Sequence, residues 1–236
     1  MRSNHNQSNI QKKAAIMAGI ALFIMTIAAF FSYGFVHSSL VVSGEAITTL
    51  TNIQSNTALF RMEIMGWMII IIADLVVSWG FYLFFRLFHQ AYALVGVCLR
   101  LLYTVILSIA VSHLITAGGI VRESMFTEEI NRTAMQVMSS ITAFEAIWSF
   151  GLILFGLHLI TVGYVAMKTK HIPKPISILL ILAGFGYALI HSLYTFIPQL
   201  ENVTHLLELI LMTPMFIGEL GFGIWLLAKG RKLTIH

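Results

Sequence analysis

The stretch WMIIIIADLVVSW, residues 67–79, contains a single charged residue, Asp74, in an otherwise apolar run between two tryptophans. It lies inside a longer apolar segment, 59–85, which exceeds the ~20 residues that a helix needs to cross a bilayer. Because lipid offers the backbone no hydrogen-bond partner, such a segment must be helical. A carboxyl group at its centre should face a partner on another helix. The stretch therefore predicts a membrane span and a buried polar position.

The composition of the whole chain supports the same class. Of its 236 residues, 58% are hydrophobic and 10% are charged, whereas about 25% are charged in an ordinary globular domain. This excludes a soluble enzyme, a disordered chain and a disulfide-rich scaffold. The net charge of +4 does not indicate nucleic acid, because the basic residues cluster at span ends. Cys98, the single cysteine, is interpreted as a small buried hydrophobic residue.

Six segments are long and apolar enough to span a membrane, and we predict that all six are helical. We expect an all-α fold, a six-transmembrane-helix bundle that forms one domain over 14–228, with tails at 1–13 and 229–236. The first span is too long for a signal peptide and is interpreted as a retained anchor. The predicted spans are 14–36, 59–85, 91–116, 135–167, 176–197 and 203–228.

The distribution of basic residues predicts the orientation in the membrane. With the N-terminus in the cytoplasm, only Arg122 and Arg132 of the loop lysines and arginines fall outside. Both termini are therefore predicted to be cytoplasmic. Residues 118–134 carry Val121, Met125, Phe126 and Ile130 at helical spacing, which is compatible with a short amphipathic outer helix or with an ordinary loop.

Four ionisable residues from different spans fall at one depth. At ~1.5 Å per residue, Asp74, Arg100, His158 and Glu219 each lie ~15–18 Å from the cytoplasmic end of their span. We predict that they meet at mid-bilayer as a ligand or proton site. Arg100 is the fixed positive charge, Asp74 its partner, Glu219 the titrating acid and His158 the proton relay. One arginine against two acids leaves excess negative charge, so Glu219 or Asp74 should carry a proton or share one with His158.

A second polar layer is predicted nearer the outer surface. Glu63, His205 and Glu208 lie there with Arg61 above them, and we expect these four residues to line the entrance of a cavity open to the outside. Glu63 lies eleven residues before Asp74, which places both on nearly the same helix face.

Further in-span residues have less defined roles. His191, Tyr187 and Trp67 are additional candidates for the site, with core packing as the alternative for Trp67. Glu145 lies thirteen residues from His158 and is expected to point to a different face.

The spacing of the in-span acids and histidines gives little indication of a metal site or a catalytic site. Glu63, His205 and Glu208 could form a metal site, but the order His-x-x-Glu reverses the Glu-x-x-His of di-iron bundles. We therefore predict no cofactor and assign no catalytic residue.

Six motifs lie in the predicted spans: LFR at 59–61, ADLVVSW at 73–79, RLLY at 100–103, FGLH at 155–158, LAGFGY at 182–187 and GEL at 218–220. Together they resemble a bacterial family known as domain of unknown function 4386, over almost the whole chain from about residue 14. The family's polar positions correspond to Arg61, Asp74, Arg100, His158 and Glu219, whereas His191 departs from an acid. The resemblance implies a bacterial multi-pass membrane protein, which we place in the cytoplasmic membrane, and no particular activity.

The preferred functional hypothesis is binding, with proton-linked movement, of a small molecule, lipid or cation in the polar cavity. An intramembrane enzyme, with or without a metal, is one alternative, although we lean against an enzyme. The other is a non-catalytic accessory or immunity-type protein whose ion network only specifies which helices meet. The bilayer is the predicted partner, nucleic acid is not, and the oligomeric state stays open.

Overall fold

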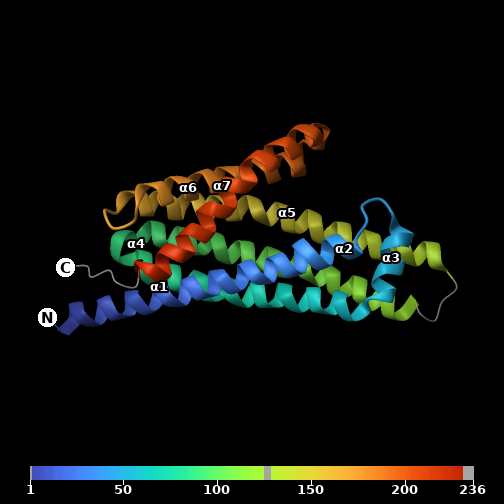
Figure 1. The fold of residues 1–236 in the computed structure, drawn as a ribbon, viewed down its shortest axis with the longest axis horizontal. Helices are drawn as coiled ribbons and strands as arrows, with labels where there is room; N and C mark the ends of the chain where they lie inside the picture. The colour runs from blue at the N-terminus through green and yellow to red at the C-terminus, as the bar shows by residue number, and fades with distance from the viewer. Residues whose placement is uncertain (1, 125–128, 231–236) are drawn as a thin grey trace. The chain divides into compact units, whose positions relative to one another are not determined.

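A computed structural model describes residues 2–124 and 129–230, and this part of the chain is almost entirely helical, with no β-strand (Figure 1). The elements in chain order are α1 (Arg2–Ala29), the π-helical η1 (Phe30–His37), α2 (Ser38–Leu40), α3 (Ala46–Ser55), α4 (Thr57–Ser124), α5 (Ile130–Lys168), α6 (Lys174–Phe196), the 3₁₀ turn η2 (Pro198–Leu200) and α7 (Glu201–Ala228).

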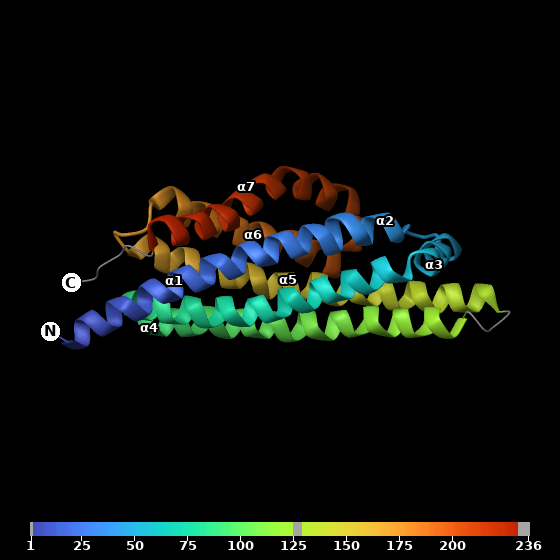
Figure 2. The ribbon, with the colours of Figure 1, turned by 60° about the horizontal axis from the view of Figure 1, so that its bottom comes forward.

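Helix α4 is broken at His89, where the backbone leaves the helical region with φ −158° and ψ 97°. The parts of α4 before and after this residue run side by side (Figures 1 and 2). Each part exceeds the ~20 residues of a span, so α4 supplies the predicted second and third spans. Within the described residues, five helices are long and apolar enough to cross a membrane, and the break in α4 raises the number of segments of that length to six. The helical fold is confirmed, while the cytoplasmic placement of the termini stays a prediction.

The chain packs as two compact units. The first comprises the described residues of Met1–Phe23, Ala73–Thr104 and Ser149–His236, and the second comprises those of Ile24–Ile72 and Val105–Trp148. Helices α1, α4 and α5 contribute to both units, whereas α6 and α7 belong to the first. The single domain predicted over 14–228 stays a prediction.

Helices α5 and α6 approach within backbone contact in the first unit. A Cβ atom added at Gly156 would lie 2.5 Å from the carbonyl oxygen of Gly184, and one added at Gly184 would lie equally close to that of Gly156. Small residues permit such close approach between spans. Helix α7 lies beside α6 (Figures 1 and 2), so the three helices that carry His158, Tyr187 and Glu219 form one packed group.

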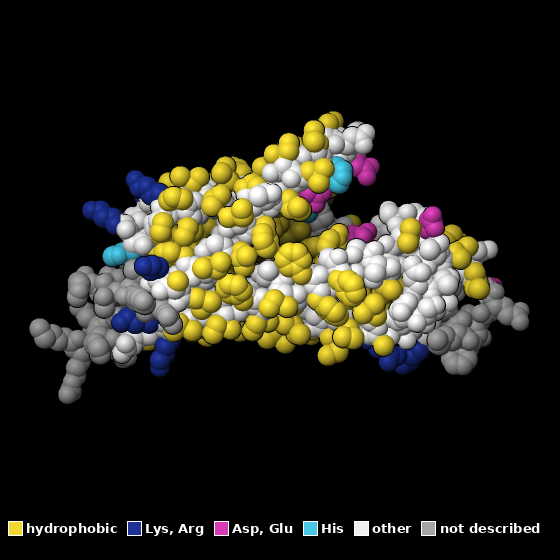
Figure 3. Space-filling view, viewed as in Figure 1, with side chains coloured by type: hydrophobic (Ala, Val, Ile, Leu, Met, Phe, Trp, Pro, Cys, Tyr) yellow, Lys and Arg dark blue, Asp and Glu magenta, His cyan; other side chains and the backbone are white. Residues whose placement is uncertain are grey.

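Much of the visible surface is covered by hydrophobic side chains, as expected for spans that face lipid (Figure 3). Cys98 belongs to this surface and is exposed, so the prediction of a buried cysteine is wrong. The physical reason is that lipid is as apolar as a protein core, and hydrophobicity alone does not say which face a residue takes.

In their described part, residues 118–134 do not form the separate amphipathic helix with which their spacing is compatible. Residues 118–124 continue α4, where Val121 is buried, and Ile130 begins α5. Met125 and Phe126 lie outside the described residues, as do residues 231–236 of the predicted C-terminal tail.

Candidate functional site

Arg100 occupies the centre of the first unit and joins three helical segments. Its Nε donates a hydrogen bond to Oδ1 of Asp74 at 2.8 Å, and its Nη2 donates to the same oxygen at 2.5 Å. Its Nη1 donates to Nε2 of His158 at 3.2 Å. All three side chains are fully buried. Asp74 and Arg100 come from α4 on either side of the break, and His158 comes from α5, so the break at His89 is what allows the ion pair to form.

The hydrogen bonds of His158 determine its tautomer. A guanidinium has no acceptor, so Nε2 of His158 must accept from Arg100. The ring proton therefore lies on Nδ1, which donates to the carbonyl oxygen of Gly96 at 2.8 Å. In this arrangement the imidazole is neutral and both nitrogens are engaged. The predicted relay role would require one of these two bonds to break.

Two phenyl rings enclose the Arg100 guanidinium. Its Cζ lies 5.7 Å from the ring centroid of Phe81 and 5.3 Å from that of Phe155. Phe81 also stacks on His158 at 5.9 Å. Cation–π contacts of this kind are strongest where water is excluded, so the rings help to hold a charge inside the membrane.

The two carboxyl oxygens of Asp74 differ in their contacts. Both bonds from Arg100 reach Oδ1, and Oδ2 is buried with no hydrogen-bond partner among the residues that the structure describes. Leaving a buried carboxylate oxygen unpaired costs more than a typical hydrogen bond contributes. Such an atom calls for a proton, an ordered water or a ligand.

Glu219 completes the predicted group of four. It lies half-buried on α7 and interacts electrostatically with Tyr187, Arg100 and Asp74. The structure thus brings Asp74, Arg100 and His158 into direct contact and places Glu219 within their electrostatic reach. Tyr187, an additional candidate from the sequence, belongs to the same site.

The remaining first-unit candidates lie along α6 and α7. His191 Nδ1 lies 2.9 Å from the Ser149 hydroxyl, and its ring stacks on Tyr187 at 6.1 Å. Glu208 accepts a hydrogen bond from Tyr194 at 2.8 Å. Nδ1 of His205 lies 3.8 Å from the same oxygen of Glu208, and the His205 side chain is largely exposed.

Glu63 does not line a cavity entrance, because it is fully buried in the second unit. His37 of η1 lies against it, with Nδ1 2.7 Å from Glu63 Oε1, and the other ring nitrogen lies 3.1 Å from Oε1 of Glu145. Trp67 Nε1 donates to the same oxygen of Glu63 at 3.4 Å. The prediction that Glu63 faces an opening is therefore wrong, and Trp67 belongs to this second polar cluster.

His37 contacts Glu63 through one ring nitrogen and Glu145 through the other, and each of these two hydrogen bonds requires a proton. Each contact needs one hydrogen, and an ionised carboxylate supplies none. Either the imidazole is protonated on both nitrogens between two carboxylates, or it is neutral and one glutamate is protonated. Both distributions leave a net charge of one negative unit. Four aromatic rings surround the cluster: Tyr33, Trp67, Phe144 and Trp148.

His37 was not among the predicted site residues, because the predicted first span ends at residue 36. The helix instead continues through η1 to residue 37, and π-helical segments are rare and recur at functional sites. The available signal was the pair of in-span acids, Glu63 and Glu145, without a basic partner. Among residues 2–124 and 129–230, no group of three or more His, Cys, Asp or Glu side chains is arranged to hold a metal ion.

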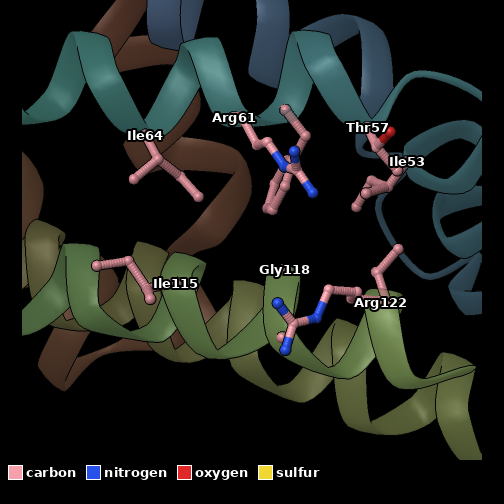
Figure 4. A pocket seen from close by; sticks show the side chains of 10 residues that line it. Ile53, Thr57, Arg61, Ile64, Ile115, Gly118 and Arg122 are labelled. Atoms are coloured by element: carbon pink, nitrogen blue, oxygen red, sulfur yellow. The ribbon is translucent and has the colours of Figure 1, made fainter.

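A cavity of about 670 Å³ also lies in the second unit, and Arg61, predicted at an entrance, lines it (Figure 4). It is formed by residues of α3 and of both parts of α4: Ile53, Thr57, Phe60, Arg61, Ile64, Ile115, Gly118, Gly119, Val121 and Arg122.

The fold and its buried ion network define a class of helical membrane protein with charged residues inside the spans. Within that class, the chain belongs to the family described as "Domain of unknown function (DUF4386)", which matches residues 17–230. The family predicted from the sequence is thereby confirmed. The chain is also similar to an uncharacterized protein of Archaeoglobus fulgidus, with 30% identity over 154 residues, covering 61% of this chain and 86% of that protein. No solved structure matches.

Proposed function

We propose that the chain is a multi-pass protein of a bacterial cytoplasmic membrane, with both termini inside, that binds a small cationic ligand at the Asp74–Arg100–His158–Glu219 centre in exchange for a proton. The observation that carries this proposal is the buried and unpaired Oδ2 of Asp74. This oxygen accepts no hydrogen bond from any described residue. Burying an acceptor without a donor costs free energy.

The charges of the centre favour a cation. Arg100 contributes one positive charge, Asp74 and Glu219 contribute one negative charge each when ionised, and His158 is neutral in its observed hydrogen bonds. The ionised centre therefore has one uncompensated negative charge, which a proton or a cationic ligand would neutralise. Glu219 is the better exchanging acid, because it is half-buried whereas Asp74 is fully buried.

Thermal unfolding of the purified protein in detergent tests this function. Ethylammonium chloride is the probe, and sodium chloride at the same concentration controls for ionic strength. A ligand that binds only the folded state stabilises it, by about 2.7 kcal/mol at a hundred times its Kd. We expect ethylammonium to raise the Tm of the wild type and not that of Asp74→Asn or Glu219→Gln.

Glu208→Gln is the matched control, since Glu208 also lies on α7 and accepts a hydrogen bond from Tyr194 of α6. This variant should keep the full response. An equal Tm in both salts, or a response that survives in Asp74→Asn, would overturn the proposal.

A purely structural ion network is the second candidate, and one observation favours it. The Arg100 guanidinium is engaged by Asp74 and His158 and enclosed by two phenyl rings, which is the arrangement of a group that joins helices. Under this alternative, ethylammonium has no effect on any variant, while loss of Arg100 still destabilises the fold.

A further inference from the structure

The cavity in the second unit has the size of a ligand site. Its volume of about 670 Å³ lies within the roughly 300–1,000 Å³ of typical small-molecule pockets. Its walls are mainly apolar and are contributed by α3 and by both parts of α4. The apolar lining consists of Ile53, Phe60, Ile64, Ile115 and Val121.

Two cations enter this apolar space. Arg61 and Arg122 extend from facing parts of α4, and their side chains point into the same cavity (Figure 4). Neither forms an ion pair with an acid of the described residues. Two neighbouring guanidinium groups repel each other, and an anion between them removes that repulsion. Guanidinium groups bind phosphate oxygens particularly well.

The cavity has a charged end and an apolar end. Arg61 lies four residues after the start of α4 at Thr57, and Arg122 lies two residues before its end at Ser124, so both charges belong to the helix ends. Ile64 and Ile115 lie one and two turns farther into the spans and face each other across the cavity (Figure 4). Helix ends lie near the lipid headgroups and span interiors lie among the acyl chains. The cavity therefore matches an amphiphile with an anionic head.

Two glycines keep the space open. A Cβ atom added at Gly119 would meet no atom within 4 Å, and one added at Gly118 would meet the Phe60 ring at 3.5 Å. A larger side chain at Gly119 would therefore occupy free space without a clash at its Cβ. This position allows the cavity to be filled while both arginines remain.

We propose that this cavity binds an anionic glycerophospholipid, with the phosphate between Arg61 and Arg122 and an acyl chain between Ile64 and Ile115. Basic pockets between transmembrane helices bind anionic headgroups on the cytoplasmic side of membranes, and the same charge-assisted hydrogen bonds can form at the predicted outer end of this cavity. The inference is independent of the proposed function, because all of its residues lie in the second unit.

Native mass spectrometry of the detergent-purified protein tests the charge requirement. The probes are phosphatidylglycerol and phosphatidylcholine with identical acyl chains, at equal concentration. We expect preferential retention of phosphatidylglycerol, and about a tenfold loss of that retention in the double variant Arg61→Gln/Arg122→Gln, since charge-assisted hydrogen bonds contribute about this factor. Arg132→Gln is the control, because Arg132 is exposed and pairs with Glu129. Equal retention of both lipids would overturn the proposal.

A second arm tests the cavity itself. Gly119→Leu should abolish preferential retention while folding normally, because leucine favours a helix over glycine. Gly221→Leu is the matched control, since a Cβ there also meets nothing within 4 Å, and it should retain the lipid. If folded Gly119→Leu binds as the wild type does, the lipid lies outside the cavity and the proposal is wrong. If inorganic phosphate at the concentration of the lipid displaces phosphatidylglycerol, the site recognises the free anion, which would also overturn the assignment.

Discussion

Arg100 shows how a permanent charge is accommodated inside a span. Its positive charge is matched by Asp74, one of its Nη1 hydrogens is donated to His158, and its faces are covered by phenyl rings. Burying such a pair stabilises little on balance, whereas removing one partner leaves an uncompensated buried charge. Stability at this site should therefore depend on the pair and not on either residue alone.

Arg100→Ala is expected to lower the free energy of unfolding by about 3–5 kcal/mol, because it leaves Asp74 ionised and buried without its partner. Unfolding in mixed micelles measures the effect. Arg132→Ala, at an exposed ion pair, should change stability by about 0–1 kcal/mol. The double variant Arg100→Ala/Asp74→Ala should lose less than the sum of the single changes, and strict additivity would contradict the pairing.

His37 joins two acids that differ in burial, and this difference leads to a second prediction. Glu63 is fully buried, whereas 43% of the Glu145 side chain is exposed. Glu63→Ala should lower the free energy of unfolding by about 1–3 kcal/mol, because it leaves the buried His37 Nδ1 and Trp67 Nε1 without their shared acceptor. Glu145→Ala should cost less, about 1 kcal/mol, because nearly half of this side chain already lies outside the packed interior. Equal losses in the same unfolding assay would rule out the assignment of Glu63 as the buried member.

At the scale of elements, the contact between α5 and α6 depends on the absence of side chains. Gly156 and Gly184 bring two backbones together where a Cβ would lie 2.5 Å from a carbonyl oxygen. Backbone cannot move aside as a flexible side chain can, so the helices themselves would have to separate. This contact holds α5, which carries His158, against α6, which carries Tyr187.

Gly156→Ala is therefore expected to destabilise the protein by about 1–3 kcal/mol through overpacking, although alanine favours a helix over glycine. The same change at Gly221, where a Cβ meets nothing within 4 Å, should be neutral or stabilising. Thermal unfolding of the two variants in one detergent checks the prediction. A stabilised Gly156→Ala protein would show that α5 and α6 are not in backbone contact.

At the scale of the whole molecule, the orientation in the membrane is the prediction to test. On a Cys98→Ser background, Thr48→Cys should react with a membrane-impermeant maleimide in intact cells, because 37–57 is predicted to be an outer loop. His171→Cys, between α5 and α6, should react only after the cells are permeabilised. The reverse pattern would place both termini outside and would contradict the positive-inside assignment.

The spans and the depth of their charges follow from the order of the residues alone. Backbone groups in lipid must be satisfied within a helix, so length and apolarity identified six spanning segments, and a constant rise per residue placed Asp74, Arg100, His158 and Glu219 at one level. The tertiary structure alone decided which side of each helix faces a neighbour. Lipid and protein interior are equally apolar, so nothing in the local sequence marks the exposed face of Cys98 or the buried face of Glu63. His37 could be paired with two acids only once η1, α4 and α5 lay together, since that contact joins residues far apart in the chain.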